Sequence, residues 1–318
     1  MFGDAFHRTL SKASRMKIVI RNFMQHLIIA LINWGQWLLR SKIMLFSFFM
    51  SRHPGRYLFT RGKIGGVDYI VNAQDIAVGR RIFIGLDDEH LKAEKAIAWI
   101  KSLSNQEISS IVDIGANIGH ITIPLLKRGV VSKAYCYEPD PENYKLLQVN
   151  LLLNGLTDMV KCEQIALTRE DSHFLLELSE NNFGDHRIRK SNHSGSYGES
   201  SRTVLKVMGK RLDSVIPKSS LSETEQPLLW LDVQGYEAEV LWGAQTYVFS
   251  RNPLVLEFWP YGLNRVNGVG DLINILSVYN EFMDLDDIEP LPRPIGDLLS
   301  MYQGNLGRSA YFRDILLI

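Results

Sequence analysis

Cysteine is scarce in this chain, since only Cys136 and Cys162 occur among its 318 residues. Each lies inside an apolar run that we interpret as a strand, where a small thiol packs like a hydrophobic side chain. Two cysteines are too few for a disulfide framework or a thiolate zinc site. No other residues show metal-ligand spacing. The composition therefore favours a reducing compartment and a protein that needs no metal.

Long apolar runs are also missing. The longest uncharged stretch, residues 22–39, includes the polar residues Gln25, His26, Asn33 and Gln36 and falls short of the ~20 predominantly apolar residues that a membrane-spanning helix needs. No small-residue cleavage site follows its apolar part, which disfavours a secretory signal peptide. Internal repeats are absent too. With 46% hydrophobic and 22% charged residues, the chain is expected to form one α/β domain with extensions.

Acidic residues are nearly absent from the first 63 positions. These positions contain eleven Lys and Arg residues and one acid, Asp4, which gives a net charge of +10. The remaining residues carry a net charge of −10. We interpret residues 1–63 as a basic helical extension and 64–318 as the main domain. Apolar segments with Trp34 and Trp37 between basic residues are typical of helices on an anionic membrane surface.

Other arrangements of this N-terminal extension remain open. Its helices would alternatively pack on the main domain, pack on a second copy in a homo-oligomer, or span a membrane. The expected location is the cytoplasm, including the inner face of a membrane.

The glycine fingerprint of dinucleotide-binding proteins is missing, and a different turn stands in its place. Residues 111–120 read Ile-Val-Asp-Ile-Gly-Ala-Asn-Ile-Gly-His, and a second apolar run ends at Glu138. Gly115 and Gly119 allow positive φ and close approach of a ligand to the backbone, and Asn117 tolerates a left-handed conformation. An acid placed like Glu138 accepts hydrogen bonds from ribose hydroxyls. The stretch predicts a βαβ unit that binds a nucleoside-type ligand.

Four motifs in this order resemble the FkbM family of S-adenosylmethionine-dependent methyltransferases. They are Asp113-Ile-Gly-Ala-Asn-Ile-Gly119, Tyr137-Glu-Pro-Asp140, Leu231-Asp-Val-Gln-Gly-Tyr-Glu237 and Leu241-Trp-Gly-Ala244. Asn117 matches the Asn that FkbM-like turns carry where the common class I turn has a middle Gly. Family members usually carry Asp-x-Glu-Gly in the third motif, but this chain has Gln234.

The resemblance implies an α/β fold, a class I methyltransferase-like Rossmann sheet with helices on both faces, and S-adenosyl-L-methionine as cofactor. Residues 64–318 would then be the methyltransferase domain. Asp113 suits an ammonium group or a bound water of that ligand. Near the end of the expected strand 160–167, Gln164-Ile-Ala166 reaches the same sheet edge as Glu138, where Ala166 would flank an adenine.

The order of elements follows from apolar periodicity. Residues 67–71 and 81–84 read as two short strands, and residues 281–300 read as a loop. The principal helices are expected at 87–103, 119–128, from Pro141 to Asn154, and at 271–279. Strands are expected at 110–114, 134–138, 160–167, 228–233, 253–260 and 310–318, with a pair at 174–178 and 204–207.

Acids at strand ends are the candidate catalytic residues. Asp232 and Glu257 each end an apolar strand, at the edge where open α/β sheets bind ligands. Transfer to an alcohol needs a group that removes its proton, so these two carboxylates are the first candidates and His186 is the third. His186 lies in the polar segment 181–201, which is either a substrate lid or a solvated surface loop.

The predicted function is S-adenosylmethionine-dependent methylation of a hydroxyl oxygen on a glycan, a lipid-linked sugar or a small metabolite. The alternative is a membrane-peripheral protein that binds the cofactor, or acts as a scaffold, with little or no turnover. Gln234 in place of the family Glu keeps that alternative open. A nucleic-acid substrate is disfavoured, because the basic N-terminal residues are interleaved with aliphatic runs and no Asn-Pro-Pro-Tyr-type motif occurs.

Overall fold

The structure is a computed structural model that describes residues 31, 34–51, 57–62, 66–190, 195–222 and 225–318. The chain divides into two compact units, Met1–Pro54 and Gly55–Ile318. In the smaller unit, residues 34–51 form a helix. None of the described helices combines the length and the apolar character needed to cross a membrane.

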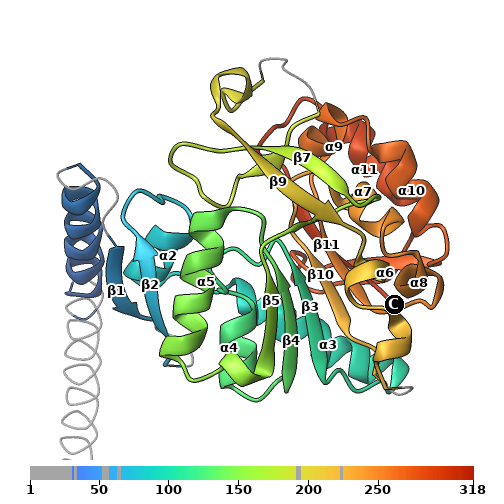
Figure 1. Cartoon of the computed structure of the whole chain (residues 1–318), viewed down its shortest axis with the longest axis horizontal. Coiled ribbons are helices and arrows are strands. Elements are labelled where there is room, and N and C mark those ends of the chain that lie inside the picture. Colours follow the sequence, from blue (N-terminus) through green and yellow to red (C-terminus); the bar gives the residue numbers. More distant parts are fainter. Residues whose placement is uncertain (1–30, 32–33, 52–56, 63–65, 191–194, 223–224) are drawn as a thin grey trace, which may run out of the picture. The chain divides into compact units, whose positions relative to one another are not determined.

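A large mixed sheet organises the second unit (Figure 1). Five of its strands are parallel neighbours, whereas the C-terminal strand β14 runs antiparallel to β11. The strand order reverses between β3 and β10, which creates the crevice where doubly wound sheets bind ligands. In spatial order the strands are β13 (Arg293–Pro294), β12 (Glu281–Asp284), β14 (Arg313–Leu317), β11 (Leu254–Phe258), β10 (Leu228–Leu231), β3 (Ser110–Ile114), β4 (Lys133–Tyr137) and β5 (Val160–Glu163).

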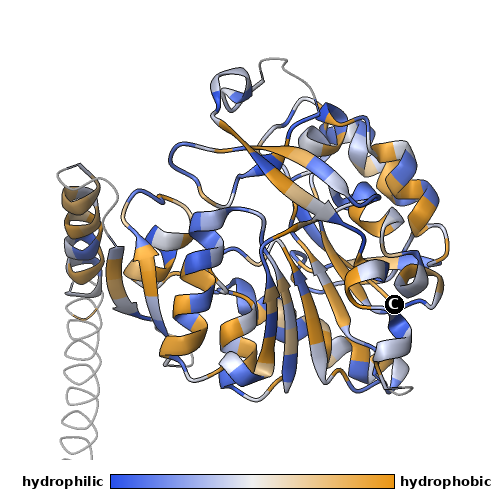
Figure 2. Cartoon of the chain, viewed as in Figure 1, coloured by the Kyte–Doolittle hydropathy of each residue, from blue (hydrophilic) through white to orange (hydrophobic). Residues whose placement is uncertain are grey.

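Helices cover both faces of this sheet, as the alternation of apolar positions predicts. Successive strand residues point to opposite faces, so Val112 and Ile114 join one core with Val240 and Leu272, while the buried Ile111, which precedes Val112, faces the other layer. Figure 2 shows the apolar stripes of these elements. The helices are α3 (Glu89–Ser104), α4 (Thr122–Lys127), α5 (Pro141–Leu153), α6 (Leu212–Val215), α7 (Glu237–Trp242), α8 (Gln245–Phe249), α9 (Pro260–Arg265), α10 (Val269–Leu276) and α11 (Asp297–Asn305).

A smaller sheet accompanies the large one. Its order is β6 (Ala166–Leu167), β9 (Val204–Lys210), β7 (Ser172–Glu177) and β8 (Arg187–Ile188). The predicted pairing of 174–178 with 204–207 is confirmed by the antiparallel pair β7 and β9. The expected single strand 160–167 is instead two strands, β5 in the large sheet and β6 in the small one.

A short hairpin precedes the large sheet. β1 (Tyr57–Arg61) pairs antiparallel with β2 (Asp68–Asn72). The expected boundary at residues 63/64 would divide this hairpin, so the strand pairing assigns residues 57–61 to the larger unit.

The expected strand at 81–84 is wrong, because these residues belong to helix α2 (Val78–Ile84). Asp75 explains the difference. Its carboxylate oxygens accept hydrogen bonds from the backbone N–H groups of Ala77 and Gly79, the latter at 2.6 Å, and this starts a helical turn. Likewise, residues 281–300 are not a plain loop, since they contain β12, β13 and the start of α11.

Candidate active site

A cavity of about 410 Å³ lies where four parallel strands of the large sheet end. Its wall includes Gly115 after β3, Glu138 after β4, Asp232 after β10, and Glu257 on β11. This volume lies within the range of ligand-binding pockets. The strand-end rule therefore brings these predicted site residues together at one pocket.

The fold requires both glycines of the first turn, Gly115 by packing and Gly119 by its positive φ. Gly115 has φ +87°, and a Cβ there would lie 2.0 Å from the backbone oxygen of Asp232. Gly119 has φ +86°, and its Cβ would meet side-chain atoms of Ile123 and Leu147 at 2.7 and 2.8 Å. Gly115 also lines the cavity, whereas Gly119 is not among the cavity-lining residues.

Asn117 adopts the left-handed conformation that the turn predicts, with φ +50°. Its backbone N–H donates to Glu138 Oε2 at 2.8 Å, and its side-chain amide donates to the carbonyl of Phe183 at 3.2 Å. Asn143 Nδ2 donates to the same carbonyl at 3.0 Å. The turn after β3 is thereby tied both to Glu138 and to the polar segment around Phe183.

Glu138 is buried at the end of β4 and held by backbone donors on both oxygens. Besides Asn117, the N–H of Asp140 donates to its Oε1 at 2.8 Å. Burial raises the pKa of Glu138 to about 8. Because each carboxylate oxygen has a second acceptor position, the group is oriented yet can accept two more donors from the cavity.

Asp113 and Ala166 also lie on the cavity wall. The hydroxyl of Thr122 donates to Asp113 Oδ2 at 2.6 Å, and burial raises the pKa of Asp113 to about 6. Ile165 and Ala166 supply an apolar part of the wall. The contacts expected of Asp113 with an ammonium group and of Ala166 with an adenine stay predictions.

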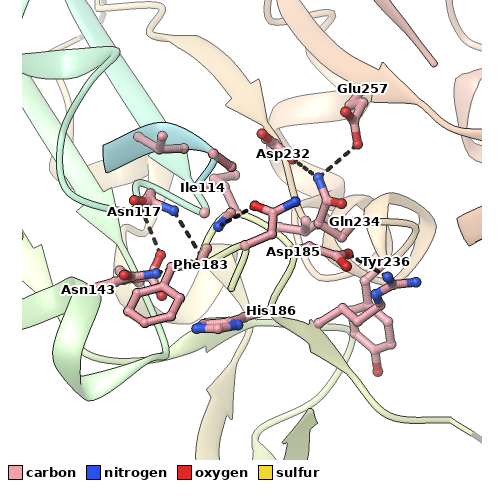
Figure 3. Close-up of a pocket in the computed structure, with 18 of the residues that line it drawn as sticks. Ile114, Asn117, Asn143, Phe183, Asp185, His186, Asp232, Gln234, Tyr236 and Glu257 are labelled. Carbon is pink, nitrogen blue, oxygen red and sulfur yellow. Dashed lines mark hydrogen bonds and ion pairs between the residues drawn. The ribbon is translucent and has the colours of Figure 1, made fainter. Parts of the chain in front are cut away.

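Gln234 links the two candidate carboxylates (Figure 3). Its Nε2 donates to Asp232 Oδ1 at 2.6 Å and to Glu257 Oε2 at 3.0 Å. Gln234 takes a positive φ of 57°, a conformation that costs energy for a residue other than glycine. Burial raises the pKa of Asp232 to about 7. Burial, with the charge of Asp232, also raises the pKa of Glu257 well above its usual value.

His120 and Glu89 line the same cavity, although we assigned neither a role from the sequence. His120 Nε2 lies 2.8 Å from Glu89 Oε2. Burial lowers the pKa of His120, but the hydrogen bond and the charges of Glu89, Asp87 and Asp113 outweigh it and raise that pKa to about 9. His120 follows Gly119 directly, and Glu89 opens α3, so only the fold brings them together.

Asp87, Glu89 and His120 present one ligand-type atom each within 4.8 Å of one another. A protonated His120 between two carboxylates accounts for this grouping, because the imidazolium neutralises part of their charge. The expectation that the protein needs no metal stays a prediction.

His186 lies on the cavity wall but apart from the two carboxylates. Figure 3 shows it beneath Phe183, on the other side of the pocket from Asp232 and Glu257. Its Nδ1 accepts a hydrogen bond from the backbone N–H of Ser179 at 3.0 Å, and burial lowers its pKa. The structure therefore does not group His186 with Asp232 and Glu257. His193, in the same polar segment, lies outside the described residues.

Buried ion pairs anchor the polar segment against the domain. Arg187 lies 2.5 Å from Asp185 and 3.4 Å from Glu199, and Arg202 also pairs with Asp185. Arg189 pairs with Glu177 at 3.1 Å. Residues 185–188 line the cavity and Arg189 is tied to Glu177 on β7, whereas residues 195–198 are exposed, so the choice between a substrate lid and a solvated loop stays a prediction.

An aromatic group adjoins this anchor at the cavity. The rings of Tyr197, Trp259 and Tyr261 lie 5.2 to 5.9 Å apart. The guanidinium of Arg187 lies 4.8 Å from the centre of the Trp259 ring. Trp259 and Tyr197 line the cavity, and together with Arg187 they form an amphipathic wall near Glu257.

Comparisons with known proteins agree with these motifs. A family model described as "Methyltransferase FkbM domain" matches residues 113–281, more than half of the chain. Methyltransferase sdnD of Sordaria araneosa is 28% identical over 177 residues, which cover 48% of this chain and 68% of that protein. The 2-O-methyltransferase NoeI of Sinorhizobium fredii is 26% identical over 157 residues, covering 46% and 61%.

Among solved structures, Methyltransferase FkbM from Methylobacillus flagellatus aligns at 15% identity with a TM-score of 0.41, covering 90% of this chain and 60% of that one. The chain thus spans about three fifths of the length of NoeI and of this structure. The matched range 113–281 includes Glu138, Asp232 and Glu257, so the family model covers most of the residues that line the cavity, although Glu89 lies outside it. The chain belongs to the FkbM family of S-adenosylmethionine-dependent methyltransferases.

Proposed function

We propose that this methyltransferase acts on a hydroxyl oxygen, with a glycan, a lipid-linked sugar or a small metabolite as acceptor. The observation that carries the proposal is the pair of carboxylates, Asp232 and Glu257, bridged by Gln234 on the cavity wall. A hydroxyl must lose its proton as its oxygen forms a new bond, so it requires a nearby base. The similar protein NoeI is named as a 2-O-methyltransferase, which supports oxygen as the accepting atom.

The acidic wall of the cavity matches the positive charge of the family's cofactor. S-adenosylmethionine supplies an activated methyl group on a positively charged sulfur. Glu138 would hold the ribose hydroxyls, because its two oxygens are already oriented by the N–H groups of Asn117 and Asp140. Asp113 would face the ammonium group, and Ile165 with Ala166 would pack against the adenine. The acidic residues of the wall attract a cationic ligand.

Asp232 is the preferred base. A pKa of about 7 leaves a substantial fraction of the carboxylate ionised at neutral pH and still able to take a proton, which is the range in which a general base works well. Gln234 donates to Oδ1 of Asp232, which fixes the carboxyl plane while Oδ2 accepts no hydrogen bond from any described residue. Glu257, whose pKa is raised well above its usual value by burial and by the charge of Asp232, would be the proton-carrying partner of the pair.

Transfer of a labelled methyl group tests the proposal. Glycan, lipid and small-metabolite fractions of a lysate would be incubated with the full chain and the methyl-labelled cofactor. The expected product is a methyl ether, which resists mild alkali, whereas a methyl ester would release methanol. Asp232→Asn should lower the rate by ~10²-fold or more, while the exposed control Asp158→Asn should match the wild type.

Two outcomes would count against this function. Label found on nitrogen or in alkali-labile esters would exclude hydroxyl transfer. Full activity of Asp232→Asn would exclude Asp232 as the base. The alternative of a cofactor-binding scaffold gains no support from the comparisons, and a wild-type protein that binds the cofactor but labels none of the fractions would revive it.

A further inference from the structure

The N-terminal helix over residues 34–51 exposes one continuous apolar stripe. The stripe consists of Trp34, Trp37, Leu38, Met44 and Leu45, whose spacing of 3, 4, 10 and 11 residues from Trp34 places them on one helical face. Trp34 and Trp37 are each 61% exposed, and Met44 is 72% exposed. Exposed side chains of this size on one face are characteristic of a surface that binds a partner.

A polar residue inside this stripe, Ser41, has its hydroxyl group satisfied by a hydrogen bond within the helix. Ser41 lies seven residues after Trp34, and its hydroxyl donates to the carbonyl of Trp37 at 2.9 Å. A serine that bonds to the carbonyl four residues earlier satisfies its donor within the helix. The stripe therefore carries no polar group that demands water, which fits an apolar environment.

Basic residues flank the stripe on both sides. At ~100° per residue, Lys42 lies on one side of Trp34, and Arg40 lies on the other. The first 63 residues as a whole carry eleven Lys and Arg and one acid. An anionic surface is the partner that matches an apolar stripe bordered by cations.

We propose that the stripe docks on an anionic lipid bilayer, with the helix lying along the membrane surface. The indole rings of Trp34 and Trp37 would sit at the headgroup level, which is where Trp is enriched. Arg40 and Lys42 would reach the lipid phosphates. A second copy of this chain fits less well, because pairing two stripes would bring the basic residues of both copies together.

The docking mode is peripheral rather than spanning. None of the described helices is long and apolar enough to cross a bilayer, and the polar residues Gln36 and Ser47 lie on the side of this helix away from the stripe. An amphipathic helix with these features binds in the plane of the interface. The inference is independent of the acceptor and of the proposed transfer to a hydroxyl.

Vesicle flotation with the full chain tests this surface. Vesicles of phosphatidylcholine with one part in four phosphatidylglycerol should carry the protein to the top of the gradient, and vesicles of phosphatidylcholine alone should carry much less. The double variant Trp34→Ser/Trp37→Ser should lose roughly tenfold or more in partitioning. The matched control Phe249→Ser removes an aromatic side chain of α8 that is 57% exposed, and it should bind like the wild type.

A second measurement reports the depth of the helix. Lipids brominated near the headgroups should quench a part of the tryptophan fluorescence that is present in the wild type and missing in the double variant. Circular dichroism of both proteins would confirm that the variant is folded.

Three results would overturn the proposal. The first is absence of wild-type flotation on the anionic vesicles, and the second is equal flotation of the double variant. The third is concentration-dependent self-association in sedimentation velocity that the double variant abolishes, since the stripe would then bind a second copy.

Discussion

Gly115 shows that a residue can match a ligand-binding motif and still be required by the fold itself. Any side chain at this position would collide with the backbone of Asp232, the first residue after the neighbouring strand β10. A substitution such as Gly115→Val would therefore disturb the sheet, and loss of cofactor binding would not report a direct contact. Glu138 is a sharper probe, because its carboxylate faces the cavity and its neighbours bond to it through backbone atoms.

Glu138→Gln should weaken cofactor binding without unfolding the protein. The amide keeps the shape of the side chain but loses the charge and places a donor where an acceptor is needed. Hydrogen bonds to charged groups contribute ~1.5–3 kcal/mol each, so an affinity loss of roughly 30-fold or more is expected. Calorimetry with S-adenosylhomocysteine would measure it, with the half-exposed Glu142→Gln as the control. Equal affinity of the wild type and Glu138→Gln would remove Glu138 from the cofactor site.

For single residues, the sequence predicts where a side chain lies better than it predicts which groups that side chain contacts. Glu138, Asp232 and Glu257 were found because each ends or nearly ends an apolar strand, and parallel strands end at one edge. The bridge from Gln234 to both carboxylates could not be predicted, since it depends on a positive φ at Gln234 and on the distance between two strand ends. His120 was visible in the turn, but its partner Glu89 is 31 residues away.

Among the elements, the polar segment between β7 and β9 differs most from its sequence-based reading. Polarity alone is equally consistent with a lid, a solvated loop and a buried network of ion pairs. The structure shows buried charges, with Asp185, Arg187 and Glu199 all inside. Glu199 also accepts a hydrogen bond from the hydroxyl of Tyr261 on α9. From the sequence alone, charged residues that pair with distant partners in the interior cannot be distinguished from charged residues on the surface.

Glu199→Gln should loosen this segment more than it unfolds the sheet. Removing one partner from a buried ion pair costs ~3–5 kcal/mol, because Arg187 would lose its pairing with this carboxylate. Hydrogen exchange should become faster from residue 183 to 202 and stay slow in β3. Lys190→Gln removes an exposed ion pair with Glu239, which should cost ~1 kcal/mol at most. Unchanged exchange in Glu199→Gln would show that the anchor contributes little.

Helices and strands were predicted correctly where the apolar pattern extends over many residues. The predictions were wrong where the pattern covers only a few residues. The stripe of α3 and the apolar strands β3, β4, β10 and β11 emerged close to their observed bounds. Four residues at 81–84 fit a strand and a helix equally well, and the hydrogen bonds that Asp75 accepts from Ala77 and Gly79 favour the helix. The division of 160–167 between two sheets depends on long-range pairing with Gly209 and Lys210, which no local pattern carries.

For the whole molecule, the buried carboxyl groups that line the cavity make folding sensitive to pH. Burial raises the pKa of Asp113 to about 6, of Asp232 to about 7 and of Glu138 to about 8. A carboxyl group with a raised pKa binds its proton more tightly in the folded state than in the unfolded state. Folding stability therefore falls as pH rises from the unfolded pKa values near 4 to the folded values near 8.

His120 acts in the same direction over part of this range. Its folded pKa of about 9 lies above the ordinary value for histidine, so the stability that it contributes is complete below about pH 6.5 and is lost as pH rises to 9. The raised pKa values of these carboxyl groups and of His120 together predict that the folded protein is more stable at pH 6 than at pH 8. A cationic ligand in the cavity should reduce this difference, because it favours the ionised carboxylates.

Glu257→Gln should make the protein less sensitive to pH. The pKa of Glu257 is raised by burial and by the charge of Asp232, and the amide cannot ionise, so the variant should gain ~1–2 kcal/mol over the wild type at pH 8 relative to pH 6. Urea unfolding at both pH values measures this difference, and the exposed Glu281→Gln serves as the control. Two results would contradict this expectation: a wild-type stability that rises from pH 6 to pH 8, or the same change of stability with pH in Glu257→Gln as in the wild type. Either result would show that these carboxylates are hydrated or paired in the folded protein. Asp232 would then titrate near its ordinary value.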